Sequence, residues 1–219
     1  MKKIFFIFLL LFILSPGARA EVMPDQLLRN IIGHISPLLQ VDLKADPDDP
    51  RILYSVFDFC EEVLPHIDFH AMAKSALGRY WQGASQSQRT RFTHEFRNLL
   101  IRVYGGTLRK YGKQEMIYLP FLAKPGDKAA VVKTEVKQAN GAPNVPISYS
   151  FYKVHSIWKL YDISVEGASL ITTYANTYSD KIQKDGLDAL IASIAQSNKE
   201  SAGGKGGAAA PAASKKSAN

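Results

Sequence analysis

Cysteine is nearly absent from this sequence, because Cys60 is the only one among 219 residues. A single thiol cannot form a disulfide within the chain, so the fold must depend on packing. Cys60 lies in an apolar stretch with helical spacing, where a free cysteine usually acts as a small buried hydrophobic residue. No glycine-rich nucleophile turn accompanies it in the sequence, so a catalytic cysteine–histidine pair is not predicted.

A strong charge of either sign is absent from the part of the chain that we expect to fold. The whole sequence has 27 basic and 20 acidic residues. Three of the basic residues belong to the first 20 residues, and four basic residues and one acid belong to the last 21. Residues 21–198 therefore have 20 basic and 19 acidic residues. A nearly neutral body does not favour a nucleic-acid partner.

Long apolar runs are absent except at the start of the chain. Lys2 and Lys3 precede an apolar run over residues 4–14, and Ala18-Arg19-Ala20 forms a small-x-small site. This arrangement is typical of a secretory signal peptide, and the run is too short to span a membrane comfortably. We predict a signal peptide at residues 1–20, cleaved after Ala20, so that the mature chain is soluble and lies outside the cytoplasm.

The rest of the chain divides into one domain and a tail. Residues 21–198 are long enough for a single domain with a sizeable core. Residues 199–219 are low-complexity Ala, Gly, Ser and Lys with almost nothing to bury, so we predict that they are disordered.

Apolar residues at helical spacing predict helices on both sides of a β-rich region. The predicted helices cover residues 24–39, 53–64, 69–78, 85–111, 169–184 and 185–197. Ser85 and Gln88 fit a capping box at the start of the longest helix. Ser169 is placed to cap the helix that follows the strands.

Alternating apolar and polar residues predict four strands, at residues 115–119, 128–137, 146–154 and 157–165. The short connections between them favour an antiparallel meander. Helices first, a sheet next and helices last predict an α+β fold.

The last predicted strand carries two acids that suggest a catalytic site. Asp162 and Glu166 are four residues apart, which is roughly 13 Å along an extended strand. Carboxylate pairs in glycoside hydrolases lie about 5 to 9.5 Å apart, so an acid–base pair is not favoured. An alternative is a cavity enzyme in which Asp162 acts as a general base and Tyr149 or Tyr161 stabilises an enolate. Strict strand alternation argues against it, because Asp162 and Tyr161 then face opposite ways.

Metal and cofactor sites have little support in the sequence. His66 and His70 have the spacing of two metal ligands on a helix. However, Pro65 directly precedes them and no third ligand stands nearby, so we predict polar residues at a helix start. The sequence also lacks a phosphate-binding glycine loop and a dinucleotide fingerprint. We therefore predict no metal and no cofactor.

The remaining signal is an excess of apolar and aromatic residues, which is more typical of a packed core but also suits a ligand cavity. Four stretches of the sequence indicate a resemblance to a known family: LPHIDFHAMAKSALGRYW, SQSQRTRFTHEFRNLLIRVYGGTL, WKLYDISVEGASLITTY and KDGLDALI. Over about residues 46–197, in this order and spacing, the chain resembles the MlaC family of periplasmic phospholipid-binding proteins, also called toluene-tolerance proteins.

The resemblance implies helices wrapped on a curved four-stranded antiparallel sheet, akin to nuclear-transport-factor-like domains, with a deep apolar pocket for acyl chains. It also implies a periplasmic carrier that maintains the lipid asymmetry of the outer membrane. Such a carrier moves phospholipid between an outer-membrane lipoprotein–porin complex and the substrate-binding subunit of an inner-membrane ABC transporter. No catalysis, metal or cofactor comes with the family.

On that basis we expect side chains from both halves of the domain to line the acyl pocket. The expected lining residues are Phe69, Met72, Leu77, Trp81, Phe96, Leu100, Val103, Tyr104, Val132, Tyr149, Phe151, Tyr161, Ile163, Val165, Leu170 and Tyr174. Arg97 and Arg102 match the family pattern and are candidates either for a phosphate head group or for an internal ion pair.

Overall fold

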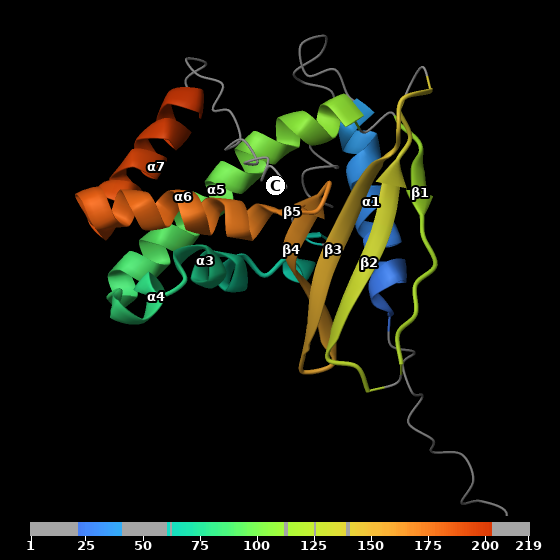
Figure 1. Cartoon of the computed structure of the whole chain (residues 1–219), viewed down its shortest axis with the longest axis horizontal. Coiled ribbons are helices and arrows are strands. Elements are labelled where there is room, and N and C mark those ends of the chain that lie inside the picture. Colours follow the sequence, from blue (N-terminus) through green and yellow to red (C-terminus); the bar gives the residue numbers. More distant parts are fainter. Residues whose placement is uncertain are drawn as a thin grey trace, which may run out of the picture.

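The computed structural model describes residues 22–40, 61, 63–111, 114–124, 126–138 and 141–202. The predicted signal peptide, Cys60, most of the predicted helix at 53–64 and the tail from residue 203 lie outside these residues. Among the described residues, no helix has the length and apolar character needed to cross a membrane. Most helices lie beside a twisted sheet, while one helix lies behind it (Figure 1).

The helices agree with the sequence pattern to within a few residues. They are α1 (Pro24–Gln40), the short 3-10 helix η2 (Leu64–His66), α3 (Phe69–Leu77), α4 (Tyr80–Gly83), α5 (Gln86–Tyr111), α6 (Leu170–Asp185) and α7 (Leu187–Ala202). The four-residue helix α4 is not predicted from the sequence. Helix α7 continues past its predicted end at residue 197, and the Gln196 side chain donates to Glu200 at 2.7 Å in this extra turn.

Both predicted helix caps are confirmed. The Ser85 backbone N–H donates to Gln88 Oε1 at 2.9 Å, and the Gln88 N–H donates to Ser85 Oγ at 3.2 Å. This is the reciprocal pattern of a capping box. At the start of α6, Ser169 Oγ accepts from the Thr172 N–H at 3.0 Å.

The sheet is an antiparallel meander of five strands in sequence order. The strands are β1 (Met116–Tyr118), β2 (Ala129–Val136), β3 (Val145–Val154), β4 (Ile157–Val165) and β5 (Ala168–Ser169). The four predicted strands are confirmed, and β5 is a two-residue addition. Glu166 and Gly167 connect β4 to β5 with φ angles of +52° and +81°. Two such residues make the turn that suits a tight hairpin.

A β-bulge interrupts the pairing of β3 with β4. Phe151 pairs with Leu160, whereas Ser150 pairs with Asp162, so Tyr161 is the extra residue. A bulge of this kind changes which face of the sheet the following side chains occupy.

The bulge overturns the predicted alternation along β4. Leu160 and Ile163 now share the face that also carries Tyr149, which pairs with Ile163. We call this the inner face, because α1 covers it. Tyr161 lies on the opposite, outer face, where its ring meets that of Tyr152 at 5.5 Å. The prediction that Tyr161 and Ile163 share one face is therefore wrong.

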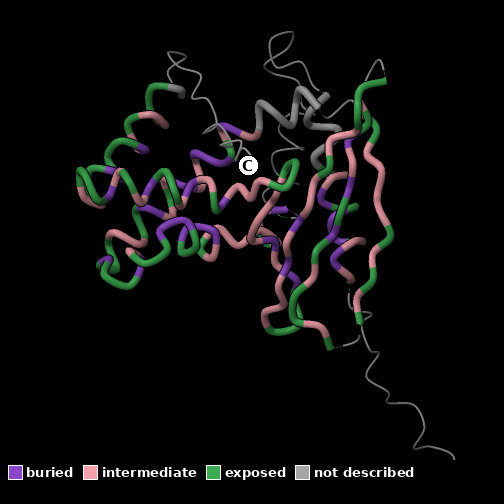
Figure 2. Tube along the Cα trace, in the orientation of Figure 1, coloured by how far each residue is buried: buried purple, intermediate pink, exposed green. Residues whose placement is uncertain are grey.

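The buried residues form two clusters. Figure 2 shows buried residues both along the helices and along the sheet. The helix cluster is formed by α3 to α7 and has at its centre Met72, Leu77, Trp81, Phe92, Phe96, Leu100, Tyr174, Tyr178 and Leu190. The sheet cluster joins Leu27, Leu28 and Ile31 of α1 to Val132, Tyr149, Phe151, Trp158 and Leu160 of the inner face. Ile67, between η2 and α3, packs against both clusters.

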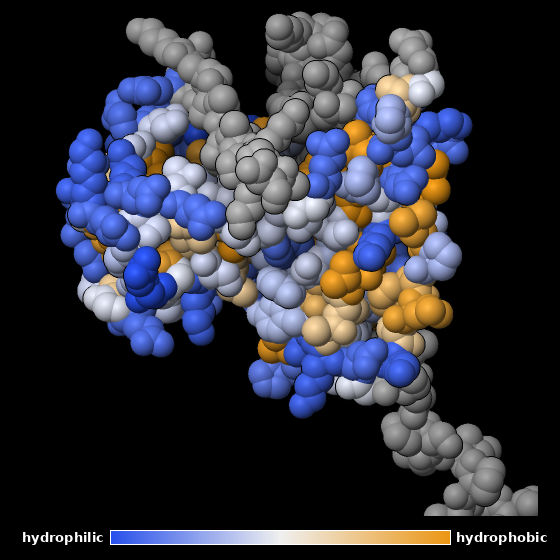
Figure 3. Space-filling model, viewed as in Figure 1, coloured by the Kyte–Doolittle hydropathy of each residue, from blue (hydrophilic) through white to orange (hydrophobic). Residues whose placement is uncertain are grey.

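The outer face of the sheet is more open. Val131, which alternates with the buried Val132 on β2, is 49% exposed. Figure 3, drawn from the same side as Figure 1, shows hydrophobic side chains among hydrophilic ones where β1 to β3 lie. The sheet therefore packs its core mainly on the α1 side.

Asp68 connects the helix layer to the sheet. Its backbone N–H donates to the Leu160 carbonyl of β4 at 2.8 Å. Its Oδ1 accepts from the Ala71 N–H at 2.8 Å and so caps α3. Its Oδ2 accepts from the Tyr152 hydroxyl of β3. One residue thus fixes where α3 leaves the sheet.

Replacing this carboxylate tests its role in stability. Asp68→Ala should lower the free energy of unfolding by about 2 kcal/mol, because α3 loses its cap and the Tyr152 hydroxyl loses its acceptor. Asp68→Asn keeps an acceptor at the cap and should lose less. Urea unfolding followed by circular dichroism measures both, and an Asp68→Ala protein as stable as wild type would contradict the assignment.

Candidate functional site

The expected lining residues lie in both buried clusters. The helix cluster contains ten of them: Met72, Leu77, Trp81, Phe96, Leu100, Val103 and Tyr174 in its interior, and Phe69, Tyr104 and Leu170 packed against it. The sheet cluster contains four: Val132, Tyr149 and Phe151 in its interior, and Ile163 packed against it. The structure therefore brings these residues into two apolar groups that meet at Ile67.

Two of the expected residues belong to neither cluster. Tyr161 lies on the outer face because the bulge turns it away from its neighbours on β4. Val165 pairs with Ile147 at the end of β4 but is 41% exposed. Neither side chain is packed in the interior as the alternation predicted.

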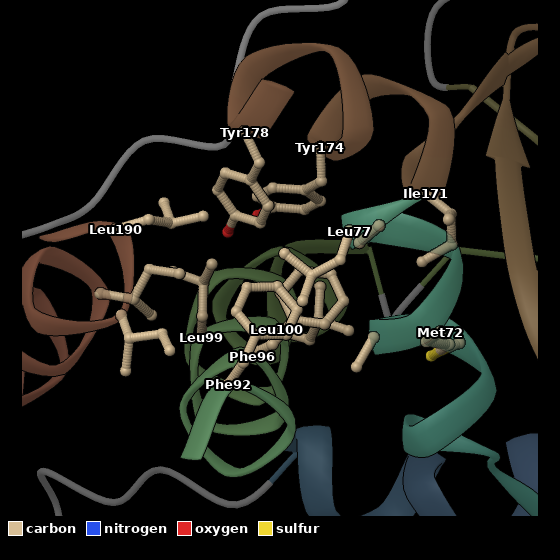
Figure 4. Close-up of a cluster of buried hydrophobic side chains, with 14 of the residues drawn as sticks. Met72, Leu77, Phe92, Phe96, Leu99, Leu100, Ile171, Tyr174, Tyr178 and Leu190 are labelled. Atoms are coloured by element: carbon tan, nitrogen blue, oxygen red, sulfur yellow. The ribbon is translucent and has the colours of Figure 1, made fainter. Parts of the chain in front are cut away.

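Aromatic rings fill the centre of the helix cluster. Phe92 and Phe96 of α5 stack with ring centroids 5.4 Å apart. Tyr174 and Tyr178 of α6 meet Phe96 nearly edge-on, at 5.2 and 5.9 Å. Figure 4 shows these side chains from α5 and α6 pointing toward one another, with Leu190 of α7 beside them. Such edge-to-face pairs are favourable beyond the area they bury.

The helix cluster also contains hydroxyl groups that the described residues leave without a hydrogen-bond partner. They belong to Tyr178 and to Tyr174, although the Tyr174 hydroxyl lies close enough to Tyr104 for the two phenols to affect each other's pKa. Burial raises the pKa of both tyrosines, and it also raises the pKa of Tyr104. An unpaired buried hydroxyl costs about 1–3 kcal/mol. A ligand bound in this interior would therefore contact these hydroxyl groups.

The sheet cluster has the same character. Burial raises the pKa of Tyr149 to about 12. Thr134 is fully buried on the same face of β2 as Val132, and its hydroxyl lies beside the Tyr149 phenol. The inner face is thus apolar with few, widely placed polar atoms.

The two candidate arginines have different surroundings. Arg102 donates to Ser197 Oγ at 3.2 Å and to Asn198 Oδ1 at 3.3 Å, which joins α5 to α7. The Arg97 guanidinium carbon lies 5.6 Å from the centre of the Phe69 ring. Arg97 Nε is buried and has no hydrogen-bond partner among the described residues.

Asp162 supports the start of α6. Its Oδ1 accepts from the N–H groups of Ile163 and Ile171, at 2.8 and 3.2 Å. Its Oδ2 accepts from the Ser169 hydroxyl at 2.6 Å. Asp162 lies on the face opposite to Tyr149, one of the two candidate enolate stabilisers, but the bulge places it on the same outer face as the other, Tyr161, so the predicted separation of Asp162 from Tyr161 is wrong. The carboxylate is nevertheless fully engaged at the start of α6. This geometry gives the general-base hypothesis no support.

The histidines of the possible metal site do not gather further ligands. The described part of the chain contains no group of three or more His, Cys, Asp or Glu side chains able to hold a metal ion. The His70 ring instead lies edge-on to Trp81, with the centroids 5.1 Å apart.

Comparison with known proteins shows to which family this chain belongs. The family model described as MlaC protein matches residues 38–196. The chain belongs to the MlaC family. The resemblance on which the sequence prediction rested is therefore confirmed.

Relatives within this group carry informative names. The intermembrane phospholipid transport system binding protein MlaC of Haemophilus influenzae is 25% identical over 189 residues, which cover 85% of this chain and 87% of that protein. The toluene tolerance protein ttg2D of Pseudomonas putida is 28% identical over 150 residues, which cover 67% of this chain and 69% of that protein.

A solved structure shares the fold. It is the phospholipid-binding protein of Ralstonia solanacearum in complex with a phospholipid. The TM-score is 0.67 at 28% identity, and the match covers 81% of this chain and 98% of that one. The predicted α+β class, with helices and an antiparallel sheet, is confirmed.

The buried phenol of the sheet cluster predicts a dependence of stability on pH. The pKa of Tyr149 is about 12 in the folded protein and 10.0 for an ordinary tyrosine. Between these values the unfolded chain loses the proton while the folded chain keeps it, so stability falls as pH rises. Between pH 10 and 12, the free energy of unfolding of Tyr149→Phe should fall by on the order of 1–2 kcal/mol less than that of wild type. Urea unfolding at several pH values measures this difference, and equal slopes for both proteins would contradict a buried neutral phenol.

Proposed function

We propose that this protein is a periplasmic phospholipid carrier, with the acyl chains held in the apolar interior and the head group near solvent. The observation that carries the proposal is the likeness to the phospholipid-bound Ralstonia protein along 98% of that chain. The apolar character of both clusters supports the same conclusion.

The energetics explain why such a carrier is needed. Each CH₂ group removed from water contributes about 0.8 kcal/mol. A phospholipid has on the order of thirty CH₂ groups, so its escape into the aqueous periplasm without a carrier is negligible. An interior built from aliphatic and aromatic side chains makes the transfer from membrane to protein nearly neutral in free energy.

The acyl chains would enter where the two clusters meet, beside Ile67, with the inner face on one side and α5 and α6 on the other. The hydroxyls of Thr134, Tyr174 and Tyr178 would then be the nearest partners for the ester groups of the lipid. Few polar contacts of this kind suit a carrier, because strong ones would slow the release of the cargo.

Direction of transport would come from partners. The sequence has no nucleotide-binding loop, so the energy would be supplied by ATP hydrolysis in an inner-membrane ABC transporter. The carrier would exchange lipid with the substrate-binding subunit of that transporter and with an outer-membrane lipoprotein–porin complex. Such exchange would maintain the lipid asymmetry of the outer membrane. The competing enzyme hypothesis needs Asp162 as a free base, but this carboxylate is engaged at the start of α6.

A tryptophan on the inner face tests the location of the cargo. Delipidated Ile163→Trp protein should take up phospholipid from vesicles about fivefold less than wild type. The reason is that the larger ring fills space at the margin of the sheet cluster. Val131→Trp is the matched control, since Val131 is exposed on the outer face. Uptake is measured by mass spectrometry of lipid extracted from the re-isolated protein.

Circular dichroism establishes that both variants are folded before uptake is compared. A folded Ile163→Trp protein that takes up as much lipid as wild type would contradict the inner-face location. Loss of uptake in Val131→Trp would indicate that the lipid contacts the outer face, and this result would contradict the proposal.

A further inference from the structure

A cleft with both polar and apolar lining residues lies at the edge of the helix cluster. It has a volume of about 640 Å³ and lies between the start of α3, the short helix α4 and one face of α5. Helix α5 contributes Gln86, Arg89, Thr90, Thr93, His94 and Arg97, and the other side contributes Ile67, Asp68, Phe69, His70 and Trp81. The α5 residues recur at intervals of three and four, so they form one continuous row along the helix.

Two donors in this cleft lack partners. Arg97 Nε and Thr93 Oγ1 are both buried, and neither has a hydrogen-bond partner among the described residues. The two residues are four positions apart on α5, so their side chains are neighbours on the helix surface. The Phe69 ring lies against the Arg97 guanidinium with a distance of 5.6 Å to its centroid. A buried guanidinium nitrogen that lacks an acceptor is costly unless something supplies one.

The cleft contains little negative charge to satisfy these donors. Asp68 is the only acid that lines it, and its two oxygens accept from the Ala71 N–H and from the Tyr152 hydroxyl. Arg89 adds a second positive charge. It is held in place because its Nε donates to the Trp81 carbonyl and its Nη2 to the Gln82 carbonyl, both at 3.0 Å. Two arginines thus line a cleft whose one lining carboxylate is already engaged.

We propose that this cleft binds a phosphate group, with Arg97 and Thr93 as its principal donors. Phosphate offers several acceptor oxygens to a guanidinium and a hydroxyl at once, and arginine is the side chain best suited to it. The phosphate could belong to the head group of a bound lipid or to a small soluble phosphate. If the phosphate is that of a bound lipid, the proposal rests on the carrier function; if it is a soluble phosphate, the proposal stands apart from that function.

A titration of the delipidated mature protein tests the site. Inorganic phosphate and glycerol 3-phosphate are added at constant ionic strength, with chloride as the reference anion, and amide chemical shifts are followed by NMR. Wild type should show saturable shifts in α5 and at the start of α3. Arg97→Gln should weaken binding by about tenfold or more, and Thr93→Val by a smaller factor of about three. Arg91→Gln is the matched control, because Arg91 is an exposed arginine of the same helix that pairs with Asp188.

The outcomes separate the possible sources of the phosphate and the possible failures. If phosphate binds only the delipidated protein, the site takes the lipid head group; if it also binds lipid-loaded protein, the site takes a soluble phosphate. Either result supports the site, provided that Arg97→Gln weakens it. Shifts that do not saturate in wild type, or that are unchanged in a folded Arg97→Gln or Thr93→Val protein, would overturn the proposal. Lipid uptake by Arg97→Gln is measured separately, so that a failure of the phosphate site can be distinguished from a failure of the carrier function.

Discussion

The structure depends on the connection that Asp68 makes between helices and sheet. Its backbone extends the hydrogen bonding of β4, its carboxylate caps α3, and the same carboxylate accepts from Tyr152 on β3. Asp162 makes a second such connection, because this β4 carboxylate accepts from Ser169 and Ile171 at the start of α6. Ile67, directly before Asp68, is also the residue that contacts both apolar clusters. Ile67 and Asp68 therefore help to fix how the helices and the sheet are placed relative to each other.

The division of the core into two clusters has a functional consequence. Each cluster is apolar enough to be stable, and the polar atoms within them are a few hydroxyls, such as those of Tyr174 and Thr134. The charged groups lie elsewhere, notably in the cleft along α5. Phe69 packs against the helix cluster and also lines this cleft, so the apolar and the cationic surfaces adjoin there. This separation of apolar and cationic surfaces is what a carrier of amphipathic cargo requires.

Much of this architecture could be predicted from the sequence, since local patterns determine it. Helical spacing located five of the helices, and Ser85 and Ser169 marked two of their starts. The bulge at Tyr161 could not be predicted, because it arises from the pairing of β3 with β4 and leaves no mark on the period of β4 itself. Tyr161 lies on the outer face for that reason, whereas Tyr149 and Phe151 on the unbulged strand are buried in the sheet cluster. The cleft was also missed, since it joins residues of α3, α4 and α5 whose proximity depends on the tertiary fold.

The central claim is that the interior of this protein carries a phospholipid. The most direct measurement is lipid analysis of the mature protein purified from the periplasm without detergent, by organic extraction and mass spectrometry, with Ile163→Trp processed in parallel. The account predicts phospholipid in amounts comparable to the protein, and clearly less in the variant. Wild-type protein that yields no phospholipid, and acquires none from vesicles, would contradict it.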